Sequence, residues 1–183
     1  MIETIIPTLD RAHFLCEQVD SVLISDSPIV LDLFYLEDIN GLVLKNFDCF
    51  TQKPDRSSQD YVEILGNKDH GKFEELGFTP QFTEILVELL GGLSTTLLGV
   101  QVTEPKKEMC PSVHVDKLPL RLVQCIDEVG TTLITGNGTQ IETEKNDLIF
   151  LKGEMWKSNV GALRHRSPAT SNLRSLLRVD FLD

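Results

Sequence analysis

The segment TPQFTEILVELLGG, residues 79–92, separates two parts of the chain that differ in hydrophobic pattern. Thr79 is suited to cap a helix, and Pro80 suits the first helical position, where a missing N–H costs nothing. The apolar residues that follow recur at helical spacing and form one stripe, and the two glycines at the end are typical of a helix C-terminus. We therefore expect an amphipathic helix over residues 80–90 that packs on a hydrophobic core.

Helical patterns also dominate the chain before this segment. The first helix is expected over residues 10–22, with the leading aspartate as its N-cap. The apolar run at residues 29–36 is compatible with a strand or a short helix, residues 41–47 resemble a short β-strand, and the polar stretch 51–59 is typical of a loop. Residues 1–92 are therefore expected to form a mainly helical part that covers one face of the remaining structure.

After residue 92 the pattern changes to short runs rich in Val, Leu, Ile and Thr, separated by turn residues such as Gly-Asn-Gly at 136–138. Several short strands without intervening helices indicate a sandwich or barrel, for example a jelly roll. The length of 183 residues favours a single domain. We therefore predict an α+β fold in which N-terminal helices pack on a C-terminal β core of residues 93–183. The expected strands are residues 95–103, 113–115, 121–126, 131–134, 147–151, 161–166 and 174–181.

The composition is that of an ordinary globular protein, with 41% hydrophobic and 25% charged residues. The chain has 17 lysines and arginines and 28 aspartates and glutamates, which gives a formal net charge of −11. Phosphate backbones and anionic membranes attract cationic surfaces, so this charge argues against bulk nucleic-acid binding and against membrane adsorption. The expected partner is a small-molecule or protein substrate, and the oligomeric state stays open.

The sequence does not open with the cationic segment and apolar run of a secretion signal, and no apolar stretch approaches the ~20 residues that span a bilayer. The four cysteines are widely spaced and include no CxxC pair. They are therefore expected to be reduced thiols rather than a disulfide framework, and the cytoplasm is the expected location.

Two histidines and one aspartate form the candidate site. In CPSVHVD, residues 110–116, His114 and Asp116 are two positions apart, so on a strand both side chains project from the same face. His165 lies in a second β-like run. Two imidazoles and a carboxylate on a β scaffold form the facial triad that binds non-haem Fe(II) and leaves other coordination positions open. The alternative is an exposed His–Asp pair without a metal, and the pattern by itself leaves both open.

Arginines in and near the last expected strand are candidate anion-binding groups. Arg174 opens the run RSLLRVDF, residues 174–181, and period two places it on the same face as Arg178 and Asp180. A guanidinium presents a fork that matches a carboxylate, so we assign Arg174 to an anion clamp and Arg178 to a surface pair with Asp180. Arg178 takes the clamp role if the register differs. For Arg121, a second anion contact and a structural ion pair stay open.

The HxD motif at residues 114–116, followed by His165 and Arg174 on expected strands, resembles the Fe(II)- and 2-oxoglutarate-dependent oxygenases of the double-stranded β-helix, or cupin-like, class. A closer resemblance is to a family of proteins known only as a domain of unknown function. This resemblance covers roughly residues 98–181, about half of the chain. The stretches that carry it are CPSVHVDKLPLRL at 110–122, LKGEMW at 151–156 and HRSP at 165–168.

The resemblance to these oxygenases implies a double-stranded β-helix over residues 93–183 and a dioxygenase or hydroxylase activity. It implies that His114, Asp116 and His165 hold Fe(II), with no catalytic residue beyond these metal ligands. It also implies that Arg174 pairs with the far carboxylate of 2-oxoglutarate, with Arg121 as a second cofactor contact. Two other functions stay open. One is a cupin-like metalloenzyme that does not use 2-oxoglutarate, and the other is a non-catalytic module that binds a small carboxylate or a protein.

Overall fold

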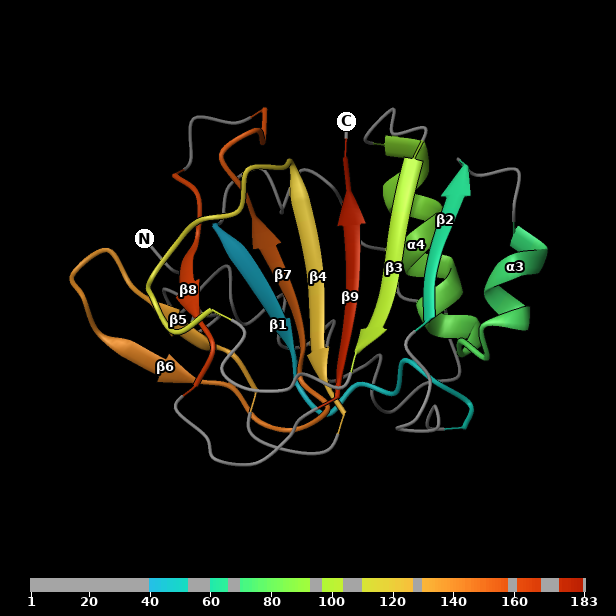
Figure 1. The fold of residues 1–183 in the computed structure, drawn as a ribbon, viewed down its shortest axis with the longest axis horizontal. Helices are drawn as coiled ribbons and strands as arrows, with labels where there is room; N and C mark the ends of the chain where they lie inside the picture. Colours follow the sequence, from blue (N-terminus) through green and yellow to red (C-terminus); the bar gives the residue numbers. More distant parts are fainter. Residues whose placement is uncertain are drawn as a thin grey trace, which may run out of the picture.

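A computed structural model of the chain contains two antiparallel β-sheets and two α-helices in the part that it describes (Figure 1). None of the helices in this part is long and apolar enough to cross a membrane. The helix expected over residues 10–22 and the apolar run 29–36 lie outside the described residues. The structure describes residues 40–52, 60–65, 70–92, 97–103, 110–126, 130–157, 161–168 and 175–182.

Six strands form the larger sheet, and every pair of neighbours in it is antiparallel. In chain order they are β1 (Gly41–Leu44), β2 (Asp60–Leu65), β3 (Leu97–Thr103), β4 (Leu120–Cys125), β7 (Leu148–Lys152) and β9 (Leu176–Phe181). Across the sheet their order is β1-β7-β4-β9-β3-β2. The expected strands at residues 95–103, 121–126, 147–151 and 174–181 are therefore confirmed, with shifts of a few residues at their ends.

Three short strands form the smaller sheet: β5 (Thr132–Ile134), β6 (Gln140–Glu142) and β8 (Arg164–Arg166), in the order β6-β5-β8. In place of the strand expected at residues 113–115, a single antiparallel bridge between His114 and His165 adds the segment before β4 to the other side of β8. From β3 to β9 the chain therefore alternates between the sheets. It runs from β3 through the His114 segment to β4, through β5 and β6 to β7, and through β8 to β9.

The turn at residues 136–138 joins β5 and β6 as a hairpin, as expected from its glycines. Gly138 has a positive φ of 87°, a conformation that glycine adopts without strain. The strand β6 itself was not among the expected strands, because its three residues, Gln-Ile-Glu, contain a single apolar side chain. Its position follows from the hairpin pairing with β5.

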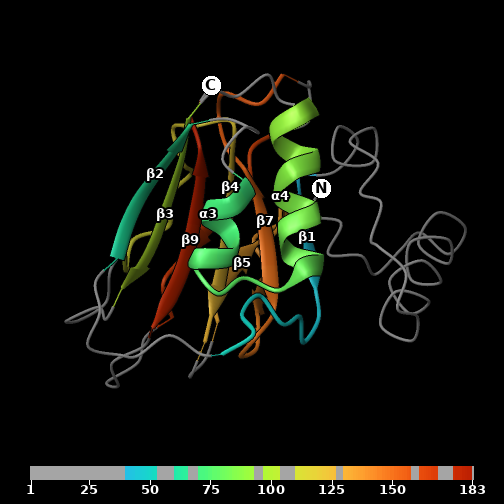
Figure 2. The same cartoon turned by 90° about the vertical axis from the view of Figure 1, so that its right-hand side faces the viewer.

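The helix α4 (Pro80–Gly92) covers one face of the larger sheet, with the short helix α3 (His70–Glu75) beside it (Figure 2). The N–H of Phe82 donates to Thr79 Oγ1 at 3.3 Å, which confirms Thr79 as the N-cap. The apolar stripe of α4 packs on side chains of the larger sheet such as Leu122 and Phe150. Five residues of this stripe are buried: Phe82, Ile85, Leu86, Leu89 and Leu90.

The opposite face of the larger sheet contacts the smaller sheet. Val123 of β4 and Ile149 of β7 form a second hydrophobic cluster with Leu133 of β5 and with Leu163, which precedes β8. Because side chains alternate along a strand, Arg121 of β4 lies on this same inner face, between two leucines that face α4. The two faces of β4 thus separate the helix-covered core from the polar residues described next.

The part before residue 93 contributes strands as well as helices. The short strand expected at residues 41–47 is present as β1. The strand β2, with the sequence DYVEIL, was not anticipated, although its Tyr, Val and Ile favour strands. Within the described residues this part therefore supplies the helix that covers the larger sheet and also both of its edge strands, β1 and β2.

Candidate metal centre

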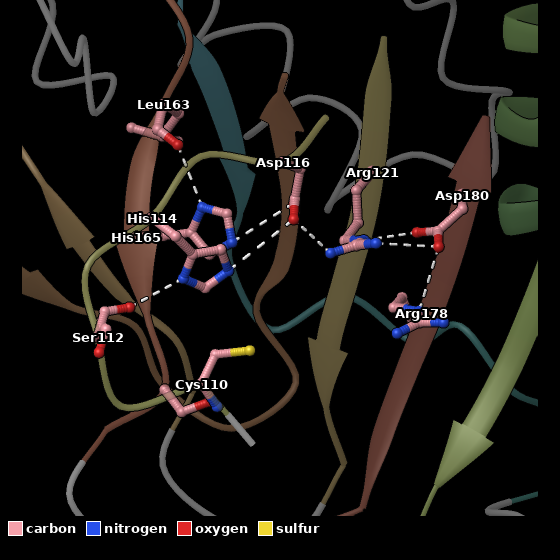
Figure 3. A network of polar contacts seen from close by, with 10 residues as sticks. Cys110, Ser112, His114, Asp116, Arg121, Leu163, His165, Arg178 and Asp180 are labelled. Atoms are coloured by element: carbon pink, nitrogen blue, oxygen red, sulfur yellow. Dashed lines mark hydrogen bonds and ion pairs between the residues drawn. The ribbon is translucent and has the colours of Figure 1, made fainter. Parts of the chain in front are cut away.

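His114, Asp116 and His165 converge beside β8 (Figure 3). One potential ligand atom from each residue lies within 4.8 Å of the other two. The distance from Asp116 Oδ2 to His165 Nε2 is 3.4 Å, and that from Asp116 Oδ1 to His114 Nε2 is 3.9 Å. Asp116 and His165 are buried and His114 is half-buried. The structure therefore brings together the three residues that the sequence singles out.

Backbone pairing explains why two histidines from distant parts of the chain meet here. The N–H of His114 donates to the carbonyl of His165 at 2.9 Å, and the N–H of His165 donates to the carbonyl of His114 at the same distance. Residues paired in this way across antiparallel strands project their side chains from the same face. The two imidazole rings accordingly lie 4.4 Å apart between centroids.

Backbone carbonyls orient both rings. The Nδ1 atom of His114 lies 2.9 Å from the carbonyl oxygen of Ser112, and that of His165 lies 3.1 Å from the carbonyl oxygen of Leu163. A carbonyl oxygen only accepts hydrogen bonds, so Nδ1 carries the proton and Nε2 is left to bind a metal ion. Burial lowers the pKa of His165 and outweighs the opposing charge of Asp116. This burial favours the neutral imidazole, the form in which histidine ligates metals.

The two oxygens of Asp116 have different surroundings. Oδ1 accepts a hydrogen bond from Nη1 of Arg121 at 2.5 Å. Oδ2 is buried and accepts no hydrogen bond from any residue that the structure describes. A buried carboxylate oxygen without a donor is unfavourable. A divalent cation between Oδ2 and the two Nε2 atoms would satisfy it, and two imidazoles with one carboxylate suit Fe(II). These residues therefore fit a metal ion.

Two arginines from neighbouring strands contact Asp180 on the inner face of the larger sheet. Arg121 donates from Nε and Nη2 to Oδ1 and Oδ2 of Asp180 at 2.5 and 3.0 Å. Burial lowers the pKa of Arg121, but the hydrogen bond and charge of Asp180 and the charge of Asp116 outweigh it, so this pKa is raised. The expected pair between Arg178 and Asp180 is present, with Nε 3.3 Å from Oδ2. Arg174 lies outside the described residues.

The turn that begins at Gly153 holds the backbone of the Asp116 segment. The N–H of Glu154 donates to the carbonyl of Asp116 at 2.9 Å, and the N–H of Gly153 donates to the carbonyl of Pro119 at 3.0 Å. A Cβ atom at position 153 would overlap the carbonyl oxygen of Leu118 and lie 2.7 Å from that of Asp116. This close approach requires glycine, so Gly153 contributes to the position of a candidate metal ligand.

Replacing Gly153 with Ala is expected to lower the free energy of unfolding by about 1–3 kcal/mol, because the new methyl group overlaps backbone that must move. The movement displaces Asp116, so the affinity for Co(II) is also expected to fall. Urea unfolding and a Co(II) titration measure the two effects. Gly136→Ala is the matched control, since a Cβ there meets nothing within 4 Å. Equal effects of the two substitutions would contradict this role of Gly153.

Several partners in this site could not be read from the sequence. The carbonyls of Ser112 and Leu163 are backbone atoms, and the one available signal is their spacing, two residues before each histidine. Asp180 was expected to pair with Arg178, whereas its two-point contact with Arg121 follows from strand pairing, which places these two residues directly opposite each other. The register between β4 and β9 depends on how all strands of the larger sheet pair, which a local sequence pattern does not contain.

Comparison with known proteins assigns the chain to a family. Residues 81–180 match the family described as "Protein of unknown function (DUF1826)", and the chain belongs to this family. This result confirms the resemblance to a domain of unknown function. Among curated proteins, none matches the chain in sequence.

Several solved structures are distantly similar to this one. A C-terminally truncated protein of Neurospora crassa in apo form has a TM-score of 0.46 and 11% identity, over 97% of this chain and 91% of that chain. Dioxygenase for auxin oxidation 1 from Arabidopsis thaliana, in complex with 2-oxoglutarate, has a TM-score of 0.43 and 13% identity, over 93% and 78%. A Pseudomonas putida prolyl-4-hydroxylase has a TM-score of 0.42 and 13% identity, over 73% and 74%. These similarities are too distant to assign an activity.

Proposed function

We propose that this protein is a non-haem Fe(II)- and 2-oxoglutarate-dependent oxygenase. The observation that carries the proposal is the buried Oδ2 of Asp116, which lacks a hydrogen-bond donor in the described part of the chain and faces the unprotonated Nε2 of His165. Together with His114 these residues offer two imidazoles and one carboxylate, the donor set of facial-triad iron enzymes. They would hold the iron and leave other coordination positions open.

The strand connections support a double-stranded β-helix for residues 93–183. From β3 to β9 the chain alternates between two antiparallel sheets that share a hydrophobic cluster. Such alternation is the connection pattern of a jelly roll. His114 and His165 then lie side by side on the smaller sheet, and β4, which follows Asp116, belongs to the larger sheet.

In this proposal some groups of the chain bind the metal and others orient the side chains that bind it. The two histidines and Asp116 bind the metal, and the carbonyls at Nδ1 hold the rings in place. Bound Fe(II) with 2-oxoglutarate supplies oxidation by O₂, coupled to conversion of the cosubstrate to succinate and carbon dioxide. Arg174 is proposed to bind the far carboxylate of 2-oxoglutarate, and Arg121 is proposed as a second contact. The protein positions the reactants and excludes water.

A second candidate function, a metalloenzyme that does not use 2-oxoglutarate, is favoured by one observation. Arg121 and Arg178, the arginines of β4 and β9 in the described residues, both contact Asp180, and Arg121 also contacts Asp116. A guanidinium that is already paired with carboxylates binds an added anion less favourably, because its charge is already compensated. The choice between the two functions therefore depends on Arg174.

The substrate is proposed to be a small molecule or a protein rather than bulk nucleic acid, since the net charge of −11 disfavours phosphate backbones. A cytoplasmic location is proposed from the cysteines. Among the described residues, Cys49, Cys110 and Cys125 form no disulfide, and a reducing compartment keeps cysteines in this state.

Anaerobic titration of the protein with Fe(II) and then 2-oxoglutarate, followed by visible absorption, tests the proposal. We expect a new visible band only when both are present, because the band requires a 2-oxo acid chelated to the bound metal. Metal binding without this band would favour the second candidate function. Absence of metal binding would contradict both metalloenzyme functions, and the non-catalytic binding module would remain.

Replacing Arg174 with Ala is expected to weaken 2-oxoglutarate binding about 10- to 100-fold, the equivalent of a charge-assisted hydrogen-bonded contact. Fe(II) affinity is expected to stay nearly unchanged, since no metal ligand is removed. Arg174→Lys should recover part of the affinity, because a point charge does not reproduce the planar fork. Calorimetry on both variants measures the two affinities. Wild-type affinity for 2-oxoglutarate in Arg174→Ala would exclude this arginine as the anion clamp.

A further inference from the structure

We infer that Arg121 and Asp180 form a clamp that fixes Asp116 as a one-oxygen metal ligand and balances the charge beside the metal. The inference rests on the proposed function to the extent that it requires a metal at the triad. It assigns Asp180, which lies outside the triad, a positioning role through Arg121.

The clamp is built from residues that directly face each other on neighbouring strands. Arg121 of β4 is opposite Asp180 of β9 in the register of the larger sheet. The guanidinium uses Nε and Nη2 for Asp180, at 2.5 and 3.0 Å, which fixes the plane of its fork. Its remaining terminal nitrogen, Nη1, is then directed at Oδ1 of Asp116 at 2.5 Å (Figure 3). Asp180 therefore determines where Arg121 meets Asp116.

The contact with Arg121 makes the two oxygens of Asp116 unequal. Oδ1 is engaged by the guanidinium, whereas Oδ2 has no donor among the described residues and lies 3.4 Å from Nε2 of His165. Rotation about the terminal bond of the side chain would turn the carboxylate plane and bring both oxygens toward a metal. The fixed guanidinium holds one oxygen and restrains this rotation, so a single oxygen faces the metal and Asp116 occupies one coordination position rather than two.

The residues of the clamp and its ion pairs also balance one another's charges. Asp116 and Asp180 carry two negative charges, and Arg121 and Arg178 carry two positive charges, so the four residues sum to zero. Without the charge of Asp180 the four positions would sum to +1, and this excess positive charge beside a divalent cation would repel it. Asp180 thus acts on the metal in two ways, by orienting Arg121 and by neutralising it, and both effects predict weaker metal binding when its charge is removed.

The test compares Co(II) affinity in three variants, measured from the d–d absorption of bound Co(II), with thermal unfolding of the metal-free proteins as a second readout. Asp180→Asn keeps the shape of the side chain and removes its charge, and we expect its Kd to rise about 10- to 100-fold, as for other residues that orient metal ligands. Arg121→Lys keeps the charge of Arg121 without the fork, and we expect a smaller rise.

Asp147→Asn is the matched control. Asp147 is also a buried aspartate in an ion pair, with Lys45 at 2.7 Å, but it takes no part in the triad or the clamp. We expect this variant to lose stability and to bind Co(II) with wild-type affinity. A purely structural Asp180 would behave in the same way, with a lower unfolding temperature and an unchanged Kd.

The outcomes separate the clamp from the proposed function. A raised Kd in Asp180→Asn and Arg121→Lys, with an unchanged Kd in Asp147→Asn, supports the clamp. Wild-type affinity in Asp180→Asn overturns the clamp and leaves the metal site intact. If Arg121→Lys binds Co(II) with wild-type affinity and Asp180→Asn binds it weakly, the orienting role of the guanidinium fork is overturned. Charge balance would then be the one role of Asp180 that remains. Failure of the wild-type protein to bind Co(II) overturns the metal site and the clamp together.

Discussion

Asp116→Asn is expected to abolish Fe(II) binding while leaving the metal-free protein about as stable as the wild type. The amide has the shape of the carboxylate, and its oxygen can accept the hydrogen bond that Arg121 donates to Oδ1. Its NH₂ group then takes the place of Oδ2 and can donate to Nε2 of His165, which lies 3.4 Å from that oxygen. The new hydrogen bond and the weakened ion pair oppose each other, so we expect a change within about 1 kcal/mol.

The loss of affinity in Asp116→Asn is expected to exceed about 100-fold, because loss of a residue that merely orients a ligand costs ~10- to 100-fold. Anaerobic equilibrium dialysis measures the Fe(II) bound. Stabilisation by the metal gives an independent readout, since a ligand at 100 times its Kd adds ~2.7 kcal/mol to the free energy of unfolding. We expect this gain in the wild type and none in the variant.

His70→Ala is the control for Asp116→Asn. His70 begins α3, on the side of the molecule away from the smaller sheet, so its removal is expected to leave Fe(II) affinity unchanged (Figure 1). If Asp116→Asn binds Fe(II) as the wild type does, the three converging residues are not a metal site. A loss of affinity in His70→Ala as large as in Asp116→Asn would indicate a general effect of histidine loss or misfolding instead.

The candidate site could be read from the sequence because its main signal is local. His114 and Asp116 are two positions apart, a spacing that brings their side chains to one side of an extended chain, and the structure brings them together although it forms only a single bridge at His114 there. His165 was the candidate partner because it lies in a second β-like run, and the structure places the two rings 4.4 Å apart between centroids. The amphipathic helix was predicted from equally local signals, since its cap and its apolar stripe lie within one segment of the chain.

The parts of the fold and the site that could not be predicted depend on pairing between distant segments. Arg121 has one partner five residues away and another on β9, and a sequence pattern does not state which strand lies beside β4. For this reason the role of Arg121 stayed open between an anion contact and an ion pair. The strand β2 was missed for a related reason. Its residues favour a strand only modestly, and its place at the edge of the sheet is fixed by pairing with β3.

Phe82 lies at the centre of the core between α4 and the larger sheet. It is fully buried, with an exposed fraction of 0%. Its ring makes edge-to-face contacts with Phe78, at 4.9 Å between centroids, and with Phe47, at 6.3 Å. Aromatic pairs of this geometry add to the stabilisation that burial itself provides. The ring thus joins α4 to the loop after β1 and to the residue that precedes the N-cap.

Phe82→Ala is expected to lower the free energy of unfolding by about 3–5 kcal/mol, the usual cost of replacing a buried phenylalanine with alanine. This is a large share of the ~5–15 kcal/mol that stabilises a typical domain. Glu84→Ala, a position of the same helix outside its buried stripe, is the control and is expected to change stability by less than about 0.5 kcal/mol. Urea unfolding at 25 °C measures both.

The same variants test whether the two faces of the larger sheet act independently. The side chains that pack on α4 alternate along β4 with Arg121, so the cavity left by Phe82→Ala opens on the face opposite the triad. In the fraction of Phe82→Ala that remains folded, Co(II) affinity should therefore match the wild type despite the large loss of stability. A loss of stability below about 1 kcal/mol would show that α4 is not packed on the sheet as described. A fall in metal affinity as large as that of Asp180→Asn would show that the helix-covered core and the metal site are energetically coupled.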